Sequence, residues 1–211
     1  MKLDTLLAAW GRGWSATRGT PAPEALGDGA WRIAVGLPGH RVRDLLPDWP
    51  AARLQAWAAA AERPGAWVKA LIDPAALVLA PAWQRHAPEY LMSAALQDAA
   101  APPLAAGYRA ELRQQGDKLE CRVLAADGEP AARALVGLTG RHAIFDQVVT
   151  EAAHRRLGLG RHAMARLTEA ARACGADTGL LVATEEGRAL YTALGWQVDS
   201  PMAAASVAEA A

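Results

Sequence analysis

Apolar and polar residues alternate along two segments in the second half of the chain, at 108–114 and 118–125. Such alternation is typical of strands that bury one face. Two further runs rich in apolar residues follow at 132–138 and 142–150, separated by the turn sequence "TGR". The pattern therefore predicts three or four consecutive antiparallel strands.

The apolar spacing changes to that of a helix from Gly158 onward, and Gly175 suits the position just past the end of that helix. A short apolar run at 179–183 predicts a buried strand. Thr184 can cap the next helix, which stops at a glycine, and "WQVDS" after it predicts a last strand. The second half is therefore expected to have the order β-β-β-β-α-β-α-β.

The first half of the chain has a different pattern. Strand-like runs at 31–37 and 66–72 flank a segment with helical spacing that begins near Pro50. Seven of the eight tryptophans also lie in this half. Since large aromatic side chains mostly contribute buried area, we expect core and interdomain packing from them rather than a surface for stacking a substrate.

A stretch at 97–107 mixes Ala, Pro and Gly without any period, which predicts a linker. We therefore expect an N-terminal α/β module over 1–104 and a second domain over 105–211. The length of 211 residues is sufficient for one large domain or two small ones. The sequence indicates no convincing internal repeat.

Composition narrows the classes of function. Lys plus Arg and Asp plus Glu both number 22, and this balance argues against a general nucleic-acid-binding protein. The longest apolar runs are too short for a membrane span or a signal peptide, so we expect a cytoplasmic protein. Cys121 and Cys174 lie far apart without metal-ligand spacing. We expect two small buried side chains there, with neither a disulfide framework nor a metal site.

Candidate chemistry is concentrated in "HRRLGLGRHAM" at 154–164, where arginines surround two glycines at the start of a predicted helix. Glycines let an anion approach backbone N–H groups at a helix N-terminus. A Walker A loop is excluded, because Arg161 follows where that motif requires lysine. A dinucleotide-binding fingerprint matches at Gly158, Gly160 and Ala163, but the antiparallel strands upstream leave this as a remote alternative.

The longer stretch "VVTEAAHRRLGLGRHAMARL" resembles the pyrophosphate loop of the GNAT superfamily of N-acetyltransferases, whose signature is Gln/Arg-x-x-Gly-x-Gly/Ala. Arg155, Gly158 and Gly160 fill its fixed positions. Downstream, "LLVATEEGRALYTALGW" looks like the strand and helix that end the family's core. The resemblance covers roughly 107–200 and implies an α/β (α+β) GNAT acyl-CoA N-acyltransferase fold with a mixed, mostly antiparallel sheet.

The family normally inserts two helices after its first strand, and these are missing between 114 and 118. We expect the N-terminal module to supply that wall of the site. The resemblance implies that acetyl-coenzyme A is the cosubstrate, without a metal. It would lie in a splay between the strand ending at Thr150 and the strand at 179–183.

The resemblance also assigns binding and catalytic residues. The backbone of Val148, Val149 and Thr150 would pair with the pantetheine arm, and Tyr191 would protonate the departing coenzyme A thiolate. Asp146, with Glu151 and His142 nearby, is a candidate base for the attacking amine, and water is an alternative. The pyrophosphate would be held by the loop residues Arg155, Arg156, Leu157, Gly158, Leu159, Gly160 and Arg161.

The implied function is N-acetyltransfer from acetyl-coenzyme A to a primary amine of unknown identity, by direct attack in a ternary complex. A catalytically degenerate module that binds acetyl-coenzyme A for regulation or interaction is the alternative. Expected partners are a small-molecule or peptide amine, without nucleic acid or membrane. A homodimer is compatible with the sequence. The sequence does not select among acceptors.

Overall fold

The computed structural model describes residues 2–97 and 100–209. In the second half of the chain, four consecutive strands form an antiparallel meander, as the alternating pattern predicts. The predicted order of elements after them is also confirmed. The elements are β7 (Arg109–Gln115), β8 (Lys118–Leu124), β9 (Pro130–Thr139), β10 (His142–Thr150), the 3₁₀ turn η2 (Ala152–His154), α3 (Leu159–Ala173), β11 (Thr178–Thr184), α4 (Glu185–Ala193) and β12 (Gln197–Val207).

The first half contains the two strands and the helix that the sequence predicts, together with elements that it does not predict. Those are α1 (Leu3–Arg18), β1 (Glu24–Gly27), β3 (His40–Leu46), β5 (Trp83–Arg85) and β6 (Glu89–Ala95). The described part of the linker at 97–107 has no helix or strand, and residues 98 and 99 lie outside the described residues. The elements are α1 (Leu3–Arg18), β1 (Glu24–Gly27), β2 (Ala30–Leu37), β3 (His40–Leu46), α2 (Ala51–Ala61), β4 (Ala66–Ala70), the 3₁₀ turn η1 (Pro74–Ala76), β5 (Trp83–Arg85) and β6 (Glu89–Ala95).

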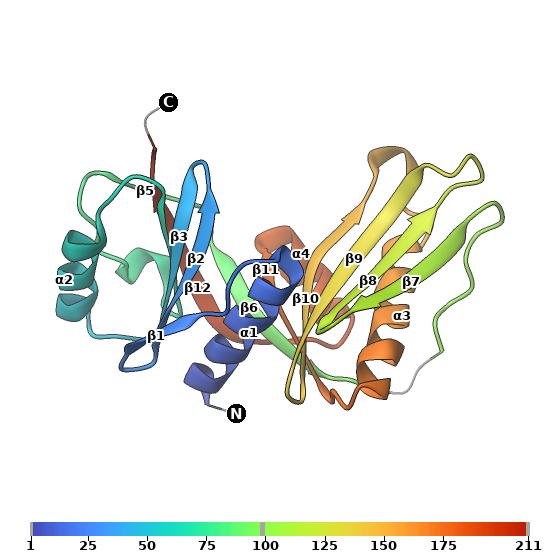
Figure 1. The fold of residues 1–211 in the computed structure, drawn as a ribbon, viewed down its shortest axis with the longest axis horizontal. Helices are drawn as coiled ribbons and strands as arrows, with labels where there is room; N and C mark the ends of the chain where they lie inside the picture. Colours follow the sequence, from blue (N-terminus) through green and yellow to red (C-terminus); the bar gives the residue numbers. More distant parts are fainter. Residues whose placement is uncertain (1, 98–99, 210–211) are drawn as a thin grey trace.

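The two halves exchange their last strands, so that one twelve-stranded sheet runs through the molecule (Figure 1). In each half, two parallel strands are joined by a crossover helix: α2 joins β3 to β4, and α3 joins β10 to β11. Strand β6 of the first half pairs with β11, whereas β12 of the second half pairs with β4 and also with β6. The halves thus share a crossover topology that the sequence does not reveal. The expected mixed, mostly antiparallel sheet is confirmed.

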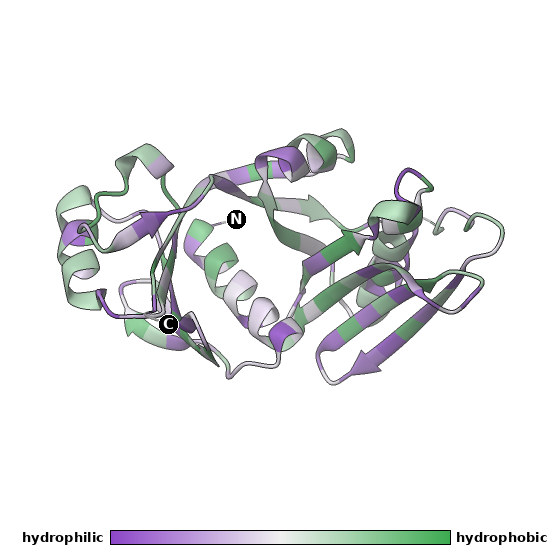
Figure 2. Ribbon diagram, turned by 90° about the horizontal axis from the view of Figure 1, so that it is seen from above, coloured by the Kyte–Doolittle hydropathy of each residue, from purple (hydrophilic) through white to green (hydrophobic). Residues whose placement is uncertain are grey.

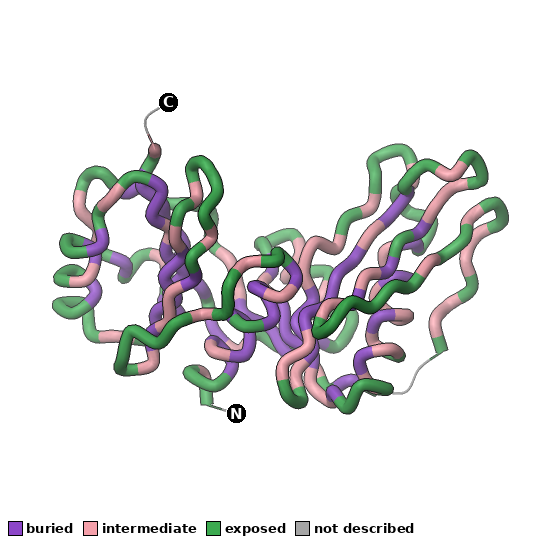
Figure 3. The backbone as a smooth tube through the Cα atoms, in the orientation of Figure 1, coloured by how far each residue is buried: buried purple, intermediate pink, exposed green. Residues whose placement is uncertain are grey.

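Helices cover both faces of the second-half meander. Side chains alternate along β10: Ala143 and Phe145 pack with α3 in one core, whereas Ile144 packs with α1 in another. Figure 2 shows α1 between the two groups of strands, and Figure 3 shows buried residues along the strands of both halves and along α1. A Cβ atom on Gly137 would lie 2.1 Å from the carbonyl oxygen of Gly13. Glycine is therefore required where α1 crosses β9.

The expectation that both cysteine side chains are buried is wrong for one of them. Cys121 is buried, but Cys174 is exposed, because it lies at the C-terminal end of α3 where the helix turns into solvent. Trp57 and Trp83 pack together in the first-half core, as expected, with ring centroids 5.4 Å apart. Trp10 is buried yet also lines the cleft described below.

Among the described helices, none has the length and apolar character that a membrane span requires.

Candidate active site

Strands β10 and β11 part soon after they meet. They pair only over His142–Ile144 and Thr178–Leu180, so the expected splay is present and opens well before Thr150. Beyond that point β10 carries a bulge, where its register with β9 shifts between Asp146 and Val149. Gln147 in the bulge has a φ of 50°. The edge of β10 that faces β11 has no strand partner beyond Ile144 among the described residues, so its backbone donors and acceptors are available for a ligand.

A cleft of about 700 Å³ occupies the space between the parted strands. Its second-half wall includes the bulge, the C-terminal part of β11 and the first turns of α4. Tyr191 and Val148 both line this wall. The opposite wall comes from the first half, from residues far away in sequence: Trp10, Trp14, Arg18, His40, Arg43, Lys69 and Glu89.

Tyr191 is placed by a well-defined helix start. The Thr184 side chain accepts a hydrogen bond from the Gly187 N–H at 3.2 Å and so caps α4. The Tyr191 ring then packs against Trp196, with centroids 5.8 Å apart. Burial raises the pKa of the Tyr191 hydroxyl. The phenol is therefore protonated at neutral pH and has a proton to donate into the cleft.

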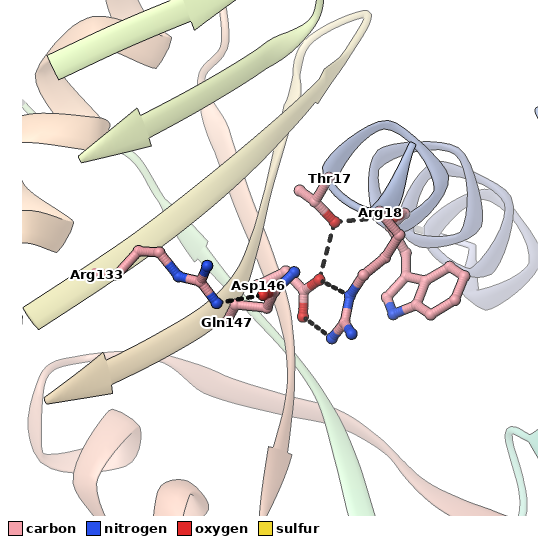
Figure 4. A network of polar contacts seen from close by, with 6 residues as sticks. Thr17, Arg18, Arg133, Asp146 and Gln147 are labelled. Atoms are coloured by element: carbon pink, nitrogen blue, oxygen red, sulfur yellow. Dashed lines mark hydrogen bonds and ion pairs between the residues drawn. The ribbon is translucent and has the colours of Figure 1, made fainter. Parts of the chain in front are cut away.

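Asp146 is held by α1. The Arg18 guanidinium contacts its carboxylate at 2.7 and 3.1 Å, and the Thr17 hydroxyl donates to the same carboxylate at 2.8 Å (Figure 4). Burial alone would raise the pKa of Asp146, but Arg18 and Thr17 stabilise the charged form and lower it overall. On the other side of the bulge, Arg133 donates to the Gln147 side chain at 2.6 Å. The bulge is therefore fixed from both faces of the sheet.

The glycine loop turns sharply into α3. Arg156 and Gly158 have φ values of 64° and 73°, and Gly158 is the N-cap residue of the helix without any side-chain cap. A Cβ atom on Gly158 would meet nothing within 4 Å, whereas one on Gly160 would lie 3.0 Å from the Thr150 hydroxyl oxygen. The loop therefore packs against the end of β10. Within the part of the chain that the structure describes, no side chain caps the N-terminus of α3, as an anion site requires.

The remaining predicted loop residues differ in exposure. Leu157 and Val149 are 47% and 44% exposed, whereas Leu159 is buried in the core beneath the loop. The Arg155 Nε donates to the Thr150 carbonyl oxygen at 3.3 Å. Leu159 can therefore contribute to ligand binding through its backbone but not through its side chain. The side chains of Arg155 and Arg161 are exposed on the surface.

The three candidate bases separate in the structure. Asp146 lines the cleft, and Glu151 is exposed just beyond the end of β10. His142 lies at the opposite end of β10, where it shares a separate surface hollow with Arg12. The structure thus brings Asp146 and Tyr191 into one cleft and leaves His142 outside it.

Sequence reasoning missed the charged residues of the first-half wall. Lys69 forms an ion pair with Glu89, and burial lowers its pKa to about 8 although Glu89 opposes that shift. Burial, aided by Arg43 and two further cations, lowers the pKa of His40 to about 4. Lysine within the apolar run "AWVKALI" was the available signal, because a buried strand rarely carries a charge without a partner.

Comparisons with known proteins agree with this fold. A GCN5-related N-acetyltransferase from Kribbella flavida superimposes with a TM-score of 0.64 at 16% identity, over 97% of this chain and 95% of that chain. A GNAT-family protein from Novosphingobium aromaticivorans gives a TM-score of 0.62 at 16% identity, over 100% of both chains. A GCN5-related N-acetyltransferase from Sphaerobacter thermophilus gives 0.57 at 13% identity, over 83% of this chain and 75% of that chain.

None of the curated proteins compared with this chain matches it significantly. A family model described as "Acetyltransferase (GNAT) family" matches residues 41–196. The match begins at β3, so the expectation that the resemblance is confined to 107–200 is too narrow. Since the matched region is most of the sequence and the fold agrees, the chain belongs to the GNAT acetyltransferase family.

Proposed function

We propose that this protein transfers an acetyl group from acetyl-coenzyme A to a primary amine, by direct attack in a ternary complex. The fold is one that supports acyl transfer. The observation that carries the finer proposal is the cleft between the parted strands, which has Tyr191 and Val148 in its wall. The glycine loop packs against Thr150, at the end of the same strand that carries Val148.

The cosubstrate would lie along the open edge of β10. Backbone groups of Val148, Val149 and Thr150 pair with the amides of the pantetheine arm in the way that an added strand would. The uncapped N–H groups of α3 receive the pyrophosphate, and Arg155 and Arg156 add charge. Open space beside Gly158 accommodates phosphate oxygens close to the backbone.

The acyl-transfer step requires one proton donor. The amine nitrogen bonds to the thioester carbonyl carbon, the carbon–sulfur bond breaks, and Tyr191 donates its hydroxyl proton to the departing sulfur. The attacking nitrogen releases a proton to water in the cleft, and solvent reprotonates Tyr191. Asp146 is engaged by Arg18 and Thr17, so we assign it to holding the bulge in place rather than to removing that proton.

Two measurements test the proposal. Acetyl-coenzyme A should raise the melting temperature, and a panel of primary amines should release free coenzyme A thiol in its presence. A thermal shift without thiol release from any amine would favour the degenerate binding module. A larger shift with NAD or NADP than with acetyl-coenzyme A would contradict the proposed cosubstrate.

A further inference from the structure

Arg43 is a buried cation without a charged partner in the first-half wall of the cleft. It lies on β3 and is 8% exposed, with its guanidinium carbon 4.3 Å from the ring centroid of Trp14 and 5.8 Å from that of Trp67. Within the described residues it forms no ion pair, and its Nε has no hydrogen-bond partner. Burial lowers the pKa of Arg43 only to about 10, so it stays charged at neutral pH.

The other charges of this wall balance one another. Lys69 pairs with Glu89 in one ion pair, and the Arg18 side chain pairs with Asp146 in another. Across the cleft, the exposed Glu186 of α4 is screened by solvent. His40 is neutral, and its buried Nε2 also has no hydrogen-bond partner among the described residues. The wall therefore has one surplus positive charge, with an unpartnered imidazole nitrogen nearby.

Arg43 also lies where two hollows meet. A second hollow of about 370 Å³ adjoins the main cleft, and both are lined by Arg43, Lys69, Glu89 and Thr184. The second hollow is bounded by Trp67, His86 and Ala204, and neither hollow is lined by a residue of the glycine loop. A ligand beside Arg43 can therefore extend into the second hollow while remaining in contact with the cleft that Tyr191 lines.

Resting on the acetyltransferase activity proposed above, we propose that the acceptor is an amine that also carries a single carboxylate, and that Arg43 binds this carboxylate. An unpartnered buried charge is costly unless a ligand neutralises it. The planar guanidinium has donors that match a carboxylate in a bidentate arrangement, while the tryptophan rings hold its plane. One surplus positive charge is balanced by one negative charge, which favours the amino-acid class over diamines and over phosphate esters.

Matched amines test the specificity. With saturating acetyl-coenzyme A, thiol release should be compared for L-lysine against cadaverine and for L-phenylalanine against phenethylamine. We expect the carboxylate-bearing member of each pair to have a kcat/KM higher by roughly tenfold or more, as for a charge-assisted hydrogen-bonded pair. Arg43→Met should remove this preference, and Arg43→Lys should keep part of it. Equal or better turnover of the amines without a carboxylate would overturn the inference while leaving the acetyltransferase proposal intact.

Arg53→Met is the matched control. Arg53 also lies over a tryptophan ring, with its guanidinium carbon 3.9 Å from the centroid of Trp49, but it is paired with Asp28 outside the cleft. It should keep the wild-type preference. Arg43→Met should not lower the melting temperature, because removing an uncompensated buried charge relieves a desolvation penalty. A preference lost equally in both variants would contradict a specific role for Arg43.

Binding without turnover separates the two proposals. N-acetyl-L-leucine and N-acetyl-L-leucinamide differ only in the carboxylate, so their effects on melting temperature report on the subsite alone. The acid should raise the melting temperature of the wild type and of Arg53→Met more than the amide does. In Arg43→Met the acid and the amide should change the melting temperature equally. If acetyl-coenzyme A fails to bind while the acid stabilises the wild type, the proposed function fails and the carboxylate subsite stands. If acid and amide act alike on the wild type, the subsite is refuted.

Discussion

The two crossovers of this molecule have the same topology, but only one is open. In the first half, β3 and β4 pair over the five positions Val42–Leu46 and Ala66–Ala70, and their side chains close a core. In the second half, β10 and β11 pair over three positions and then part around the cleft. A parallel pair with a crossover helix is therefore not sufficient for a ligand site in this fold.

The sequences that leave the first strand of each crossover explain the difference. β3 is followed by "PDWP", in which two of four residues lack an N–H group, and the Trp49 N–H is used within the turn. β10 instead carries the bulge and is followed by the glycine loop, whose helix N-terminus has no side-chain cap. The bulge opens the strands and the glycines expose the amides. The four predictions below test whether these local features account for the contrast.

The largest expected effect comes from removing the Tyr191 hydroxyl, which lies in the open crossover. Tyr191→Phe removes one proton donor and keeps the packing against Trp196. Turnover should fall by about a hundredfold or more, the usual value of acid catalysis, with an unchanged acetyl-coenzyme A thermal shift. Tyr108→Phe is the control, because the Tyr108 hydroxyl bonds the His154 Nδ1 at 2.8 Å rather than facing the cleft. Full activity of Tyr191→Phe would exclude it as the acid.

Equivalent positions in the two crossover helices should respond differently to the same side chain. Gly160 and Ala52 are both second residues of their helices, α3 and α2. Acetyl-coenzyme A at a hundred times its dissociation constant should stabilise the protein by about 2.7 kcal/mol, which raises the melting temperature by roughly 5–10 °C. Gly160→Val should abolish that shift, and Ala52→Val should retain it. Retention in both variants would contradict a pyrophosphate site at α3.

Helix α1 bridges the two crossovers, and its glycines should differ in tolerance. A Cβ atom on Gly13 would lie 2.5 Å from the Cβ of Ile144 on β10, which cannot move without its strand. A Cβ atom on Gly11 would meet the flexible end of Leu45 on β3 at the same distance. Gly13→Ala should therefore lower the free energy of unfolding by about 1–3 kcal/mol relative to Gly11→Ala. Urea titrations measure this difference, and equal stabilities would show that α1 is not anchored more tightly to the open half.

The smallest effect is a dependence of stability on pH that comes from Lys69, which reaches from the closed crossover into the cleft. Glu89, Arg43 and Asp146 face it. Its folded pKa of about 8 lies below its unfolded value, so the unfolded chain binds more protons and stability rises as pH increases above 8. Between pH 8 and 9 the wild type should gain about 1 kcal/mol relative to Lys69→Met. A flat difference would mean that Lys69 keeps its ordinary pKa.

Sequence patterns predicted β8 well because that strand buries only one face. The alternation through Leu119, Cys121 and Val123 is visible, and these side chains are indeed buried. β6 was missed since it lies mid-sheet and buries consecutive residues such as Leu91 and Met92, which removes the alternation. α1 was missed because its two interior glycines, which allow close packing, lower the helix propensity of that segment.

The same contrast holds for the candidate site. Tyr191 and the glycine loop lie in contiguous motifs, so a single sequence can indicate them. Arg43, Lys69 and Glu89 each lie on a different strand, and the pairings of β12 with β4 and β6 and of β6 with β11 bring the two halves together around them. Residue spacing along the sequence does not indicate that these three side chains lie close together. The first-half wall could therefore be expected in outline, but its residues could not be named.

The exchanged strands also constrain how the chain can reach its native state. β11 gains its antiparallel partner only from β6 of the first half, and β4 gains its second neighbour only from the segment that ends at Val207. Such pairings are distant in sequence, and folds dominated by distant pairings form slowly. Neither half has a complete sheet by itself, so cutting the chain between them leaves two fragments with unprotected sheet edges. The two halves should consequently melt in one cooperative transition and aggregate when expressed apart.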